Sequence, residues 1–275
     1  MKRAATLSAL VCLLAVTAAA PAAPDAGRGH HPAPGKSTKG TLLDSVPKKG
    51  VLRVCTTGDY RPFTHREADG SYSGIDIKMA RDLAKSLDAK PKFTATTWKE
   101  IADDVADGRC DIAVGGVSIT LPRARAVYFS EPTREDGKTP IVRCADKARF
   151  GDGTLADIDK PGTKVVVNPG GTNEQFARAH IKRASLTVHP DNSTIFQEII
   201  DGRADVMMTD AGETRYQAKI HPELCSLHPD KPFTFAEKAY ALPRGDAQFK
   251  EYVDQFVHLA THDGTYAAYE AEWMK

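Results

Sequence analysis

Apolar runs and helical repeats alternate along the chain, and they define the secondary structure that we expect. An apolar run at residues 51–54 is typical of a buried strand, and residues 92–96 resemble a second one. Between them, apolar side chains recur every four residues, at Ile75, Met79, Leu83 and Leu87, and predict a helix. Because strands and helices alternate, we expect parallel sheets with right-handed crossover connections.

A pattern of helix, glycine turn and strand occurs twice. One predicted helix ends at Asp107-Gly108-Arg109 before an apolar strand at residues 111–114. A second ends at Asp201-Gly202-Arg203 before a strand at residues 205–208. In both copies glycine stands where a left-handed helix end favours it. The chain therefore predicts two similar α/β halves.

The C-terminal segment is expected to return to the first half. A short strand at residues 238–242 precedes a helix that carries Phe249, Val253 and Phe256 on one face. We therefore predict a discontinuous first lobe at residues 46–140 plus 237–275, and a second lobe at residues 141–236. Each lobe is a mainly parallel sheet flanked by helices, and such sheets bind ligands at the carboxyl ends of their strands. We expect a ligand cleft between the lobes.

The N-terminus has the three-part layout of a secretory signal. A basic start precedes an apolar run at residues 7–16 and small residues at 18–23, which predicts a signal peptide over residues 1–23. Residues 24–45, rich in proline and glycine near their start, are predicted to be a flexible linker. The apolar run is too short to span a bilayer, and no later window is a membrane-helix candidate. We expect a periplasmic or secreted protein with no membrane partner after cleavage.

Composition narrows the class of ligand. Of 275 residues, 41% are hydrophobic and 27% charged, as in globular proteins. Lys plus Arg total 37 against 36 for Asp plus Glu, so no basic footprint for nucleic acid is present. A small-molecule partner is expected, and nothing indicates an oligomeric state.

Four cysteines follow the predicted signal. Cys144 and Cys225 lie in segments flanked by turns, whereas Cys55 and Cys110 lie in or beside apolar strands, where a buried thiol is common. An exported protein can form disulfides, and four cysteines allow three pairings. We predict a Cys144–Cys225 bond and leave the state of Cys55 and Cys110 open.

A glycine-rich turn at residues 168–173 is the most informative candidate site. It lies between a strand and a helix, where free amides and the helix dipole favour an anion. Neither a dinucleotide fingerprint nor a P-loop is present, so a carboxylate is the expected ligand. Glu174 follows directly: it is either a first-turn residue facing the helix dipole or an acid whose pKa is raised by the bound carboxylate.

Other candidate residues follow the predicted strands of both lobes. Arg123 is either a surface arginine or a residue whose guanidinium holds a ligand carboxylate through two hydrogen bonds. Arg125 is the alternative candidate for the carboxylate-binding role. Tyr60, Phe63 and Trp98 are suited to an aromatic wall or to core packing. Asp210 could accept from an ammonium or a hydroxyl group, or cap a helix. His258 and His262 lack a third ligand, so no metal is expected.

These segments together resemble a known family. From about residue 46 onward, the chain is similar to the polar amino-acid-binding periplasmic proteins of ABC transporters, which share a two-lobed type II fold. The matching motifs are Gly58-Asp59-Tyr60-Arg61-Pro62-Phe63, Gly74-Ile75-Asp76, Asp111-Ile112-Ala113, Thr120-Leu121-Pro122-Arg123 and Phe129-Ser130-Glu131-Pro132.

The chain resembles one narrower group with that fold, the cyclohexadienyl dehydratases, more closely. The motifs that carry this likeness are Asp136-Gly137-Lys138-Thr139-Pro140, Val167-Asn168-Pro169-Gly170-Gly171-Thr172-Asn173-Glu174, His189-Pro190-Asp191-Asn192, Met207-Met208-Thr209-Asp210, His221-Pro222-Glu223-Leu224-Cys225 and Phe235-Ala236-Glu237-Lys238-Ala239-Tyr240. Thr133 departs from the pattern of the binding proteins, and Arg134 and Glu135 depart from that of the dehydratases; these changes affect the expected substrate preference and rate.

The resemblance implies dehydration and decarboxylation of prephenate to phenylpyruvate, or of arogenate to phenylalanine, without a cofactor. It implies Glu174 as the general acid that protonates the departing hydroxyl group. Further residues would contact the substrate: Arg123, Thr172 and Asn173 at the carboxylates, Tyr60 and Trp98 at the ring, and also Ser118, Lys138 and Asp210. The alternative is a transport receptor that binds an amino acid without changing it.

Overall fold

The computed structural model describes residues 40–274, and the predicted signal peptide and most of the predicted linker lie outside them. Helix α1 (Leu42–Lys49) begins inside the segment expected to be linker. Its start is fixed because the Thr41 hydroxyl accepts the Leu43 amide proton and donates to Asp246 at 2.6 Å. No helix of the described residues is long and apolar enough to cross a membrane.

The first lobe contains a five-stranded sheet in the order β5-β1-β6-β15-β7. Its strands are β1 (Val51–Thr56), β5 (Lys90–Ala95), β6 (Ile112–Ala113), β7 (Val127–Phe129) and β15 (Ala241–Pro243). Its helices are α2 (Ile75–Ser86), α3 (Ile101–Ala106), α4 (Leu121–Ala126), α9 (Ala247–His262) and α10 (Thr265–Met274). A small antiparallel sheet adds β2 (Asp59–Tyr60), β3 (Thr64–Arg66) and β4 (Tyr72–Ser73).

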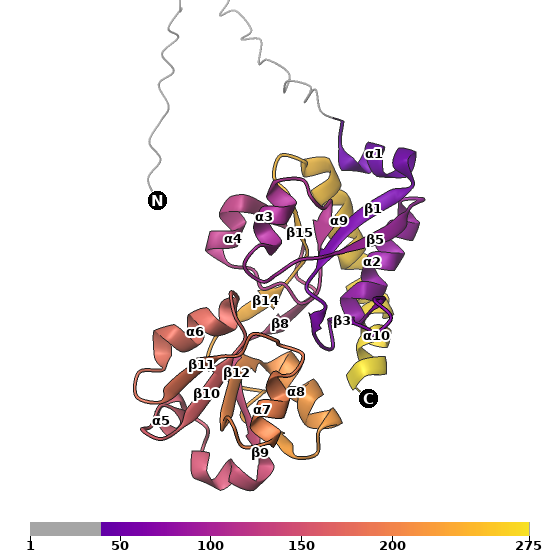
Figure 1. Cartoon of the computed structure of the whole chain (residues 1–275). Coiled ribbons are helices and arrows are strands. Elements are labelled where there is room, and N and C mark those ends of the chain that lie inside the picture. The colour runs from indigo at the N-terminus through magenta and orange to yellow at the C-terminus, as the bar shows by residue number, and fades with distance from the viewer. Residues whose placement is uncertain (1–39, 275) are drawn as a thin grey trace, which may run out of the picture. The chain divides into compact units, whose positions relative to one another are not determined.

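The second lobe repeats this arrangement, with strand order β11-β10-β12-β9-β13 (Figure 1). Its strands are β9 (Lys138–Arg143), β10 (Lys164–Val167), β11 (Ser185–Val188), β12 (Val206–Asp210) and β13 (Leu224–Ser226). Its helices are α5 (Leu155–Ile158), α6 (Thr172–His180), α7 (Ile195–Ile200), α8 (Ala211–Ile220) and the 3-10 helix η1 (Cys144–Phe150). In each sheet three neighbouring strands are parallel, and β15 or β9 runs antiparallel to them. The predicted α/β class with two similar halves is confirmed.

The chain passes between the sheets through two short strands, β8 (Arg134–Asp136) and β14 (Ala236–Lys238), which pair antiparallel. Figure 1 shows this ribbon between the two sheets. We call β8 and β14 the hinge ribbon. Strand β9 already belongs to the second sheet at Lys138, two residues before the lobe boundary that we expected.

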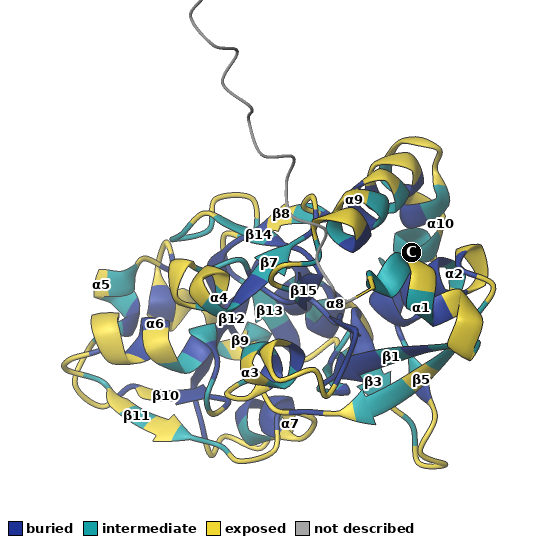
Figure 2. Ribbon diagram, turned by 90° about the horizontal axis from the view of Figure 1, so that it is seen from above, coloured by how far each residue is buried: buried dark blue, intermediate teal, exposed yellow. Residues whose placement is uncertain are grey.

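Separate apolar clusters stabilise the two lobes. Phe249 and Val253 of α9 are fully buried with Leu52 and Ile75, so the C-terminal helix does return to the first lobe. The second lobe buries its own set, including Val142, Val165, Val206 and Phe176. In Figure 2 the central strands are buried and the outer turns of α6 and α9 are exposed.

Both cysteine pairs form disulfides. Cys144–Cys225 is bonded as predicted. Cys55 and Cys110, whose state the sequence left open, are also bonded, with their Cα atoms 5.7 Å apart. Parallel pairing of β1 with β6 brings the two cysteines together, although both lie in apolar surroundings that by themselves suit a free thiol.

Candidate active site

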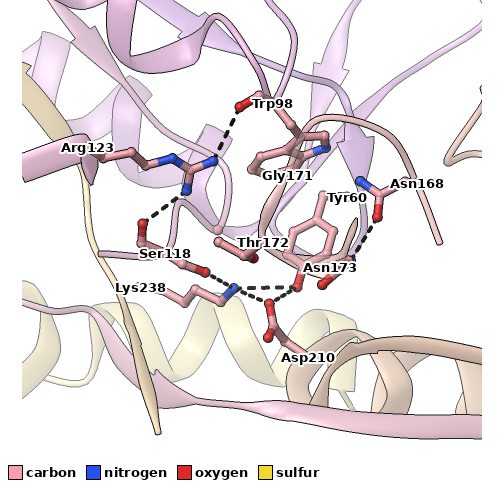
Figure 3. A pocket seen from close by; sticks show the side chains of 11 residues that line it. Tyr60, Trp98, Ser118, Arg123, Asn168, Gly171, Thr172, Asn173, Asp210 and Lys238 are labelled. Carbon is pink, nitrogen blue, oxygen red and sulfur yellow. Dashed lines mark hydrogen bonds and ion pairs between the residues drawn. The ribbon is translucent and has the colours of Figure 1, made fainter. Parts of the chain in front are cut away.

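A cavity between the lobes is lined from both sides. Figure 3 shows its residues: Tyr60, Trp98, Gly116, Ser118, Arg123 and Lys238 come from the first lobe and the hinge ribbon, and Asn168, Gly171, Thr172, Asn173 and Asp210 from the second lobe. About 250 Å³ of space, part of it open to solvent, lies among the lining residues, and their side chains leave room for about one water molecule. The cleft is therefore nearly closed.

Two lysines share the Asp210 carboxylate at the centre of this site. Lys138 at the start of β9 donates to Asp210 Oδ1 at 2.6 Å, and Lys238 at the end of β14 donates to Oδ2 at 2.5 Å. The Tyr60 hydroxyl also donates to Oδ2, at 2.9 Å. Burial alone would raise the pKa of Asp210, but the two ammonium groups outweigh it and hold the pKa well below its usual range. Asp210 thus joins both lobes through buried ion pairs. It precedes α8 but makes no side-chain capping bond there.

The glycine-rich turn faces the cavity at the N-terminus of α6. Lys138 Nζ donates to Thr172 Oγ1 at 2.9 Å and to Asn173 Oδ1 at 2.5 Å, so the second lobe brings a cation to the helix start. Burial lowers the pKa of Lys138, although the adjacent Asp210 opposes this. A helix N-terminus with a buried ammonium beside it favours an anion.

Arg123 lies on the opposite wall, in α4. Its guanidinium donates to the carbonyls of Ser118 at 3.0 Å and Trp98 at 3.3 Å, and within residues 40–274 it forms no ion pair (Figure 3). Burial lowers its pKa, but a guanidinium stays charged at neutral pH. Arg123 is therefore available to a ligand carboxylate, whereas its competitor Arg125 does not line the cavity.

The aromatic rings of Tyr60 and Trp98 form one wall of the cavity. The Tyr60 and Trp98 rings meet edge to face, with centroids 5.3 Å apart. Phe63 stacks behind Tyr60 at 5.5 Å and is fully buried, so it packs in the core and does not line the cavity.

Glu174 does not line the cavity. Its carboxylate accepts from the Gly170 amide at 2.7 Å and from Arg178 at 2.8 Å, one turn later on α6. The Gly170 hydrogen bond and Arg178 together lower its pKa. These partners stabilise the charged form of the partly exposed Glu174 side chain, as its interpretation as a first-turn residue implies. The other interpretation, an acid whose pKa rises beside a bound carboxylate, stays a prediction.

A second carboxyl group, Glu213 in the first turn of α8, has the properties that we expected of Glu174. It is fully buried, its Oε2 accepts from Thr209 at 2.6 Å, and Oε1 has no hydrogen-bond partner among the described residues. Burial raises its pKa well above the ordinary value, and the negative charges of Asp59 and Asp210 add to this. Thr209 accepts in turn from Asn173, which lines the cavity.

Sequence reasoning missed both Glu213 and Lys238. Glu213 lies three residues after Asp210 in a first turn, the same position that made Glu174 ambiguous. Lys238 ends a short strand in which it directly follows Glu237, and two adjacent charged residues are typical of an exposed edge. The apolar Ala239 and Tyr240 that follow it were the one signal for burial. Within residues 40–274, no group of three or more His, Cys, Asp or Glu side chains could hold a metal ion.

Two α/β lobes around such a cleft define a solute-binding protein. The model of the bacterial extracellular solute-binding proteins, family 3, matches residues 52–275, and the chain belongs to this family. Within the family it is 54% identical over 233 residues to the cyclohexadienyl dehydratase of Pseudomonas aeruginosa, covering 85% of this chain and 86% of that one. It is 26% identical to the L-cystine-binding protein TcyJ of Escherichia coli K12, covering 85% and 86%.

Solved structures give the same relationship. An ancestral amino acid-binding protein, described as a precursor of cyclohexadienyl dehydratase, matches with a TM-score of 0.78 and 34% identity, over 86% of this chain and all of that one. An ancestral cyclohexadienyl dehydratase matches with a TM-score of 0.54 and 47% identity, over 86% and 97%. The family thus includes both binding proteins and dehydratases.

Proposed function

We propose that this protein is a cyclohexadienyl dehydratase that acts on prephenate, with arogenate as a second candidate substrate, in the periplasm. The charge balance of the cavity carries the proposal. Arg123 and Lys238 line it, Lys138 contacts its lining residues Thr172, Asn173 and Asp210, and the single charge of Asp210 balances only one of these three cations. The excess positive charge suits a ligand with two carboxylates, and prephenate and arogenate each have two.

The binding groups are arranged around such a ligand from both lobes. Arg123 in the first lobe and the amides at the start of α6 in the second would each hold one carboxylate. The Tyr60 and Trp98 rings would cover the cyclohexadiene ring. Holding both carboxylates fixes the ring relative to the acid, and this removes orientational freedom before the reaction.

Glu213 is the acid that we assign to the reaction. Like Glu174 it does not line the cavity, and it is connected to it through Thr209 and Asn173. As a buried carboxyl group with a raised pKa, it would have to reach the substrate when the cleft rearranges around it, and would then give its proton to the ring hydroxyl, which leaves as water when the C–O bond breaks. The electron pair of the bond to the ring carboxylate enters the ring, carbon dioxide departs and the ring becomes aromatic. Glu213 is left as a carboxylate and regains a proton from solvent. Lys238 and Asp210 require no change of charge.

Glu174 is the rival acid, and its contacts weigh against that role. An acid must be protonated to donate, whereas the Gly170 amide and Arg178 favour the carboxylate form of Glu174. The two glutamates also make a matched pair of variants, because each is replaced by the same amide.

The test is the turnover of prephenate by purified protein, compared with a protein-free control because prephenate decomposes in acid. Saturable formation of phenylpyruvate is expected. Glu213→Gln should lower kcat by about 100-fold or more, and Glu174→Gln by less than about threefold. The wild-type kcat should also fall as the pH rises through a pKa well above the usual glutamate value, since only the protonated acid is active.

The opposite ranking of the two variants would return the acid role to Glu174. If the wild type gives no product above the control, and calorimetry detects binding of an amino acid, the protein is a receptor and not an enzyme. Arogenate, tested in the same assay, decides the second substrate.

A further inference from the structure

Two histidines meet at the surface end of α9. His258 and His262 are four residues apart in the helix, so they lie on the same face of it. Their rings lie side by side, with centroids 4.3 Å apart and an angle of 32° between the ring planes. Both residues are exposed, and neither lines the cavity. An ion in solution can therefore reach the pair directly.

The partners of the two Nδ1 atoms determine which nitrogen of each ring carries the proton. His262 Nδ1 lies 2.7 Å from the His258 carbonyl oxygen, and His258 Nδ1 lies 3.4 Å from Glu131 Oε2. Carbonyl and carboxylate oxygens accept protons, so the neutral rings carry theirs on Nδ1. The lone pair of each ring is then on Nε2, which is the form of histidine that binds a metal ion.

Glu131 is held beside the pair by α9 itself. Its backbone amide donates to Asp254 Oδ1 at 2.9 Å, and Asp254 stands one turn before His258 in the same helix. A carboxylate on the proton-bearing nitrogen of a histidine orients the ring and makes the other nitrogen a better metal ligand. Glu131 therefore prepares His258 for a metal without itself being a ligand.

The charge at this end of α9 also favours a cation. The helix ends at His262, and the carbonyl groups of a last helical turn carry the partial negative charge of the helix dipole. The Glu131 carboxylate adds a full negative charge beside the same turn.

The type of ligand decides which cation is suited to the pair. Imidazole nitrogens prefer Cu²⁺, Ni²⁺ and Zn²⁺, whereas Mg²⁺ and Ca²⁺ prefer oxygen ligands. Metal–nitrogen bonds of about 2.0–2.1 Å allow one ion to contact both rings after small rotations of these exposed side chains. The described residues provide no third ligand, so water molecules complete the coordination. The sequence indicated no metal here because it was judged by protein ligands alone.

We propose that His258 and His262 form a surface site for a divalent transition-metal ion, and that Cu²⁺ binds there most tightly. The bound ion connects two successive turns and stabilises the end of α9. The site lies outside the cavity, so this inference does not depend on the proposed function.

Calorimetry and electron paramagnetic resonance with Cu²⁺ test this inference. The measurements use the mature chain with His30→Ala and His31→Ala, because these adjacent histidines of the N-terminal segment can also bind copper. We expect one bound Cu²⁺ per chain with two nitrogen ligands, and weaker binding of Ni²⁺ and Zn²⁺. Glu131→Gln should lower the Cu²⁺ affinity by about 10-fold, and His258→Ala or His262→Ala by more than that.

His180 provides a matched control on another helix. It is exposed in the last turn of α6, and its ring packs against Phe176, four residues earlier, with centroids 4.4 Å apart. The spacing is that of the proposed site, but only one of the two rings can bind a metal. His180→Ala should therefore leave the Cu²⁺ affinity unchanged.

Unchanged Cu²⁺ affinity in both His258→Ala and His262→Ala would overturn the inference. So would a resonance spectrum with a single nitrogen ligand, or the absence of stoichiometric binding. Prephenate turnover should be the same in these variants as in the starting protein, because neither histidine lines the cavity. Loss of copper binding and loss of turnover are therefore separate results.

Discussion

The buried charges around Asp210 determine how individual residues of the site behave. Lys138, Lys238 and Asp210 are almost fully buried, and each depends on the others for compensation of its charge. Removing one partner of a buried pair leaves an uncompensated charge, whereas the loss of an exposed pair costs little.

Lys238→Met should lower the free energy of unfolding by about 3–5 kcal/mol, because the Asp210 carboxylate loses one of its two cations. Lys78→Met removes a lysine that pairs with Glu272 at the surface, and should cost less than about 1 kcal/mol. Urea unfolding of both variants measures the difference. Equal costs would mean that Asp210 is not held by buried ion pairs.

The residues of the site differ in how far sequence could identify them. Thr172, Asn173 and Arg123 follow strands or open helices, so local pattern was enough to place them at the cavity. Lys238 reaches Asp210 only because the hinge ribbon returns the chain to the site, and nothing local shows this. Glu174 was left with two interpretations, although Arg178, at the helical spacing of four residues, was visible as a partner for its carboxylate.

At the scale of elements, the start of α2 supports the cavity through Asp76. Asp76 Oδ2 accepts the amides of Gly115 at 3.1 Å and of Gly116 at 2.7 Å, and Oδ1 accepts from the Tyr240 hydroxyl. Gly116 lines the cavity, and a Cβ atom there would lie 2.7 Å from the Tyr60 ring. The helix thus fixes a loop that only glycine allows to approach Tyr60.

Burial raises the pKa of Asp76 to about 6. An acid with a raised folded-state pKa stabilises the protein below its unfolded pKa, and this contribution is lost as the pH rises toward 6. The free energy of unfolding should therefore lose about 2 kcal/mol between pH 4 and 6 through this group, and about 3 kcal/mol in all once the pH has passed through 6. Asp76→Asn should remove that dependence in urea titrations at several pH values.

Asp69→Asn, in an exposed turn, is the control for this titration. The pKa of Asp69 is lowered by Ser71, so its contribution has the opposite sign and is lost as the pH falls. If Asp76→Asn keeps the wild-type pH dependence, Asp76 is not the group responsible.

For the whole molecule, closure of the cleft is held by a few bonds between lobes. Asn192 Nδ2 in the second lobe donates to the Asp59 carbonyl in the first at 2.8 Å, and Tyr60 reaches Asp210. Since the closed cavity has room for about one water molecule, a substrate enters only when these bonds open.

Asn192→Ala should shift the unliganded protein toward open forms, which a larger radius of gyration in small-angle X-ray scattering would detect. Ser193→Ala, an exposed neighbour in the same loop, should scatter like the wild type. Identical profiles for both variants would show that the Asn192 bond does not hold the lobes together.

The overall fold was predictable because repeated strands and helices each bury one continuous face. Isolated short strands carry no such signal, so the pairing of β8 with β14 and the antiparallel β9 and β15 were not foreseen. The disulfide between Cys55 and Cys110 was not predicted for a related reason: it depends on which strands become neighbours in the sheet.

The two disulfides have a mechanical consequence. One lies within the first lobe and the other within the second, so neither bridges the hinge ribbon. The molecule thus consists of two lobes, each cross-linked internally, that are joined by the two strands of the hinge ribbon. Oxidation in the exported protein therefore stiffens each lobe without restricting how far the two lobes separate. The stability of the lobes and the extent of cleft opening can change independently in evolution.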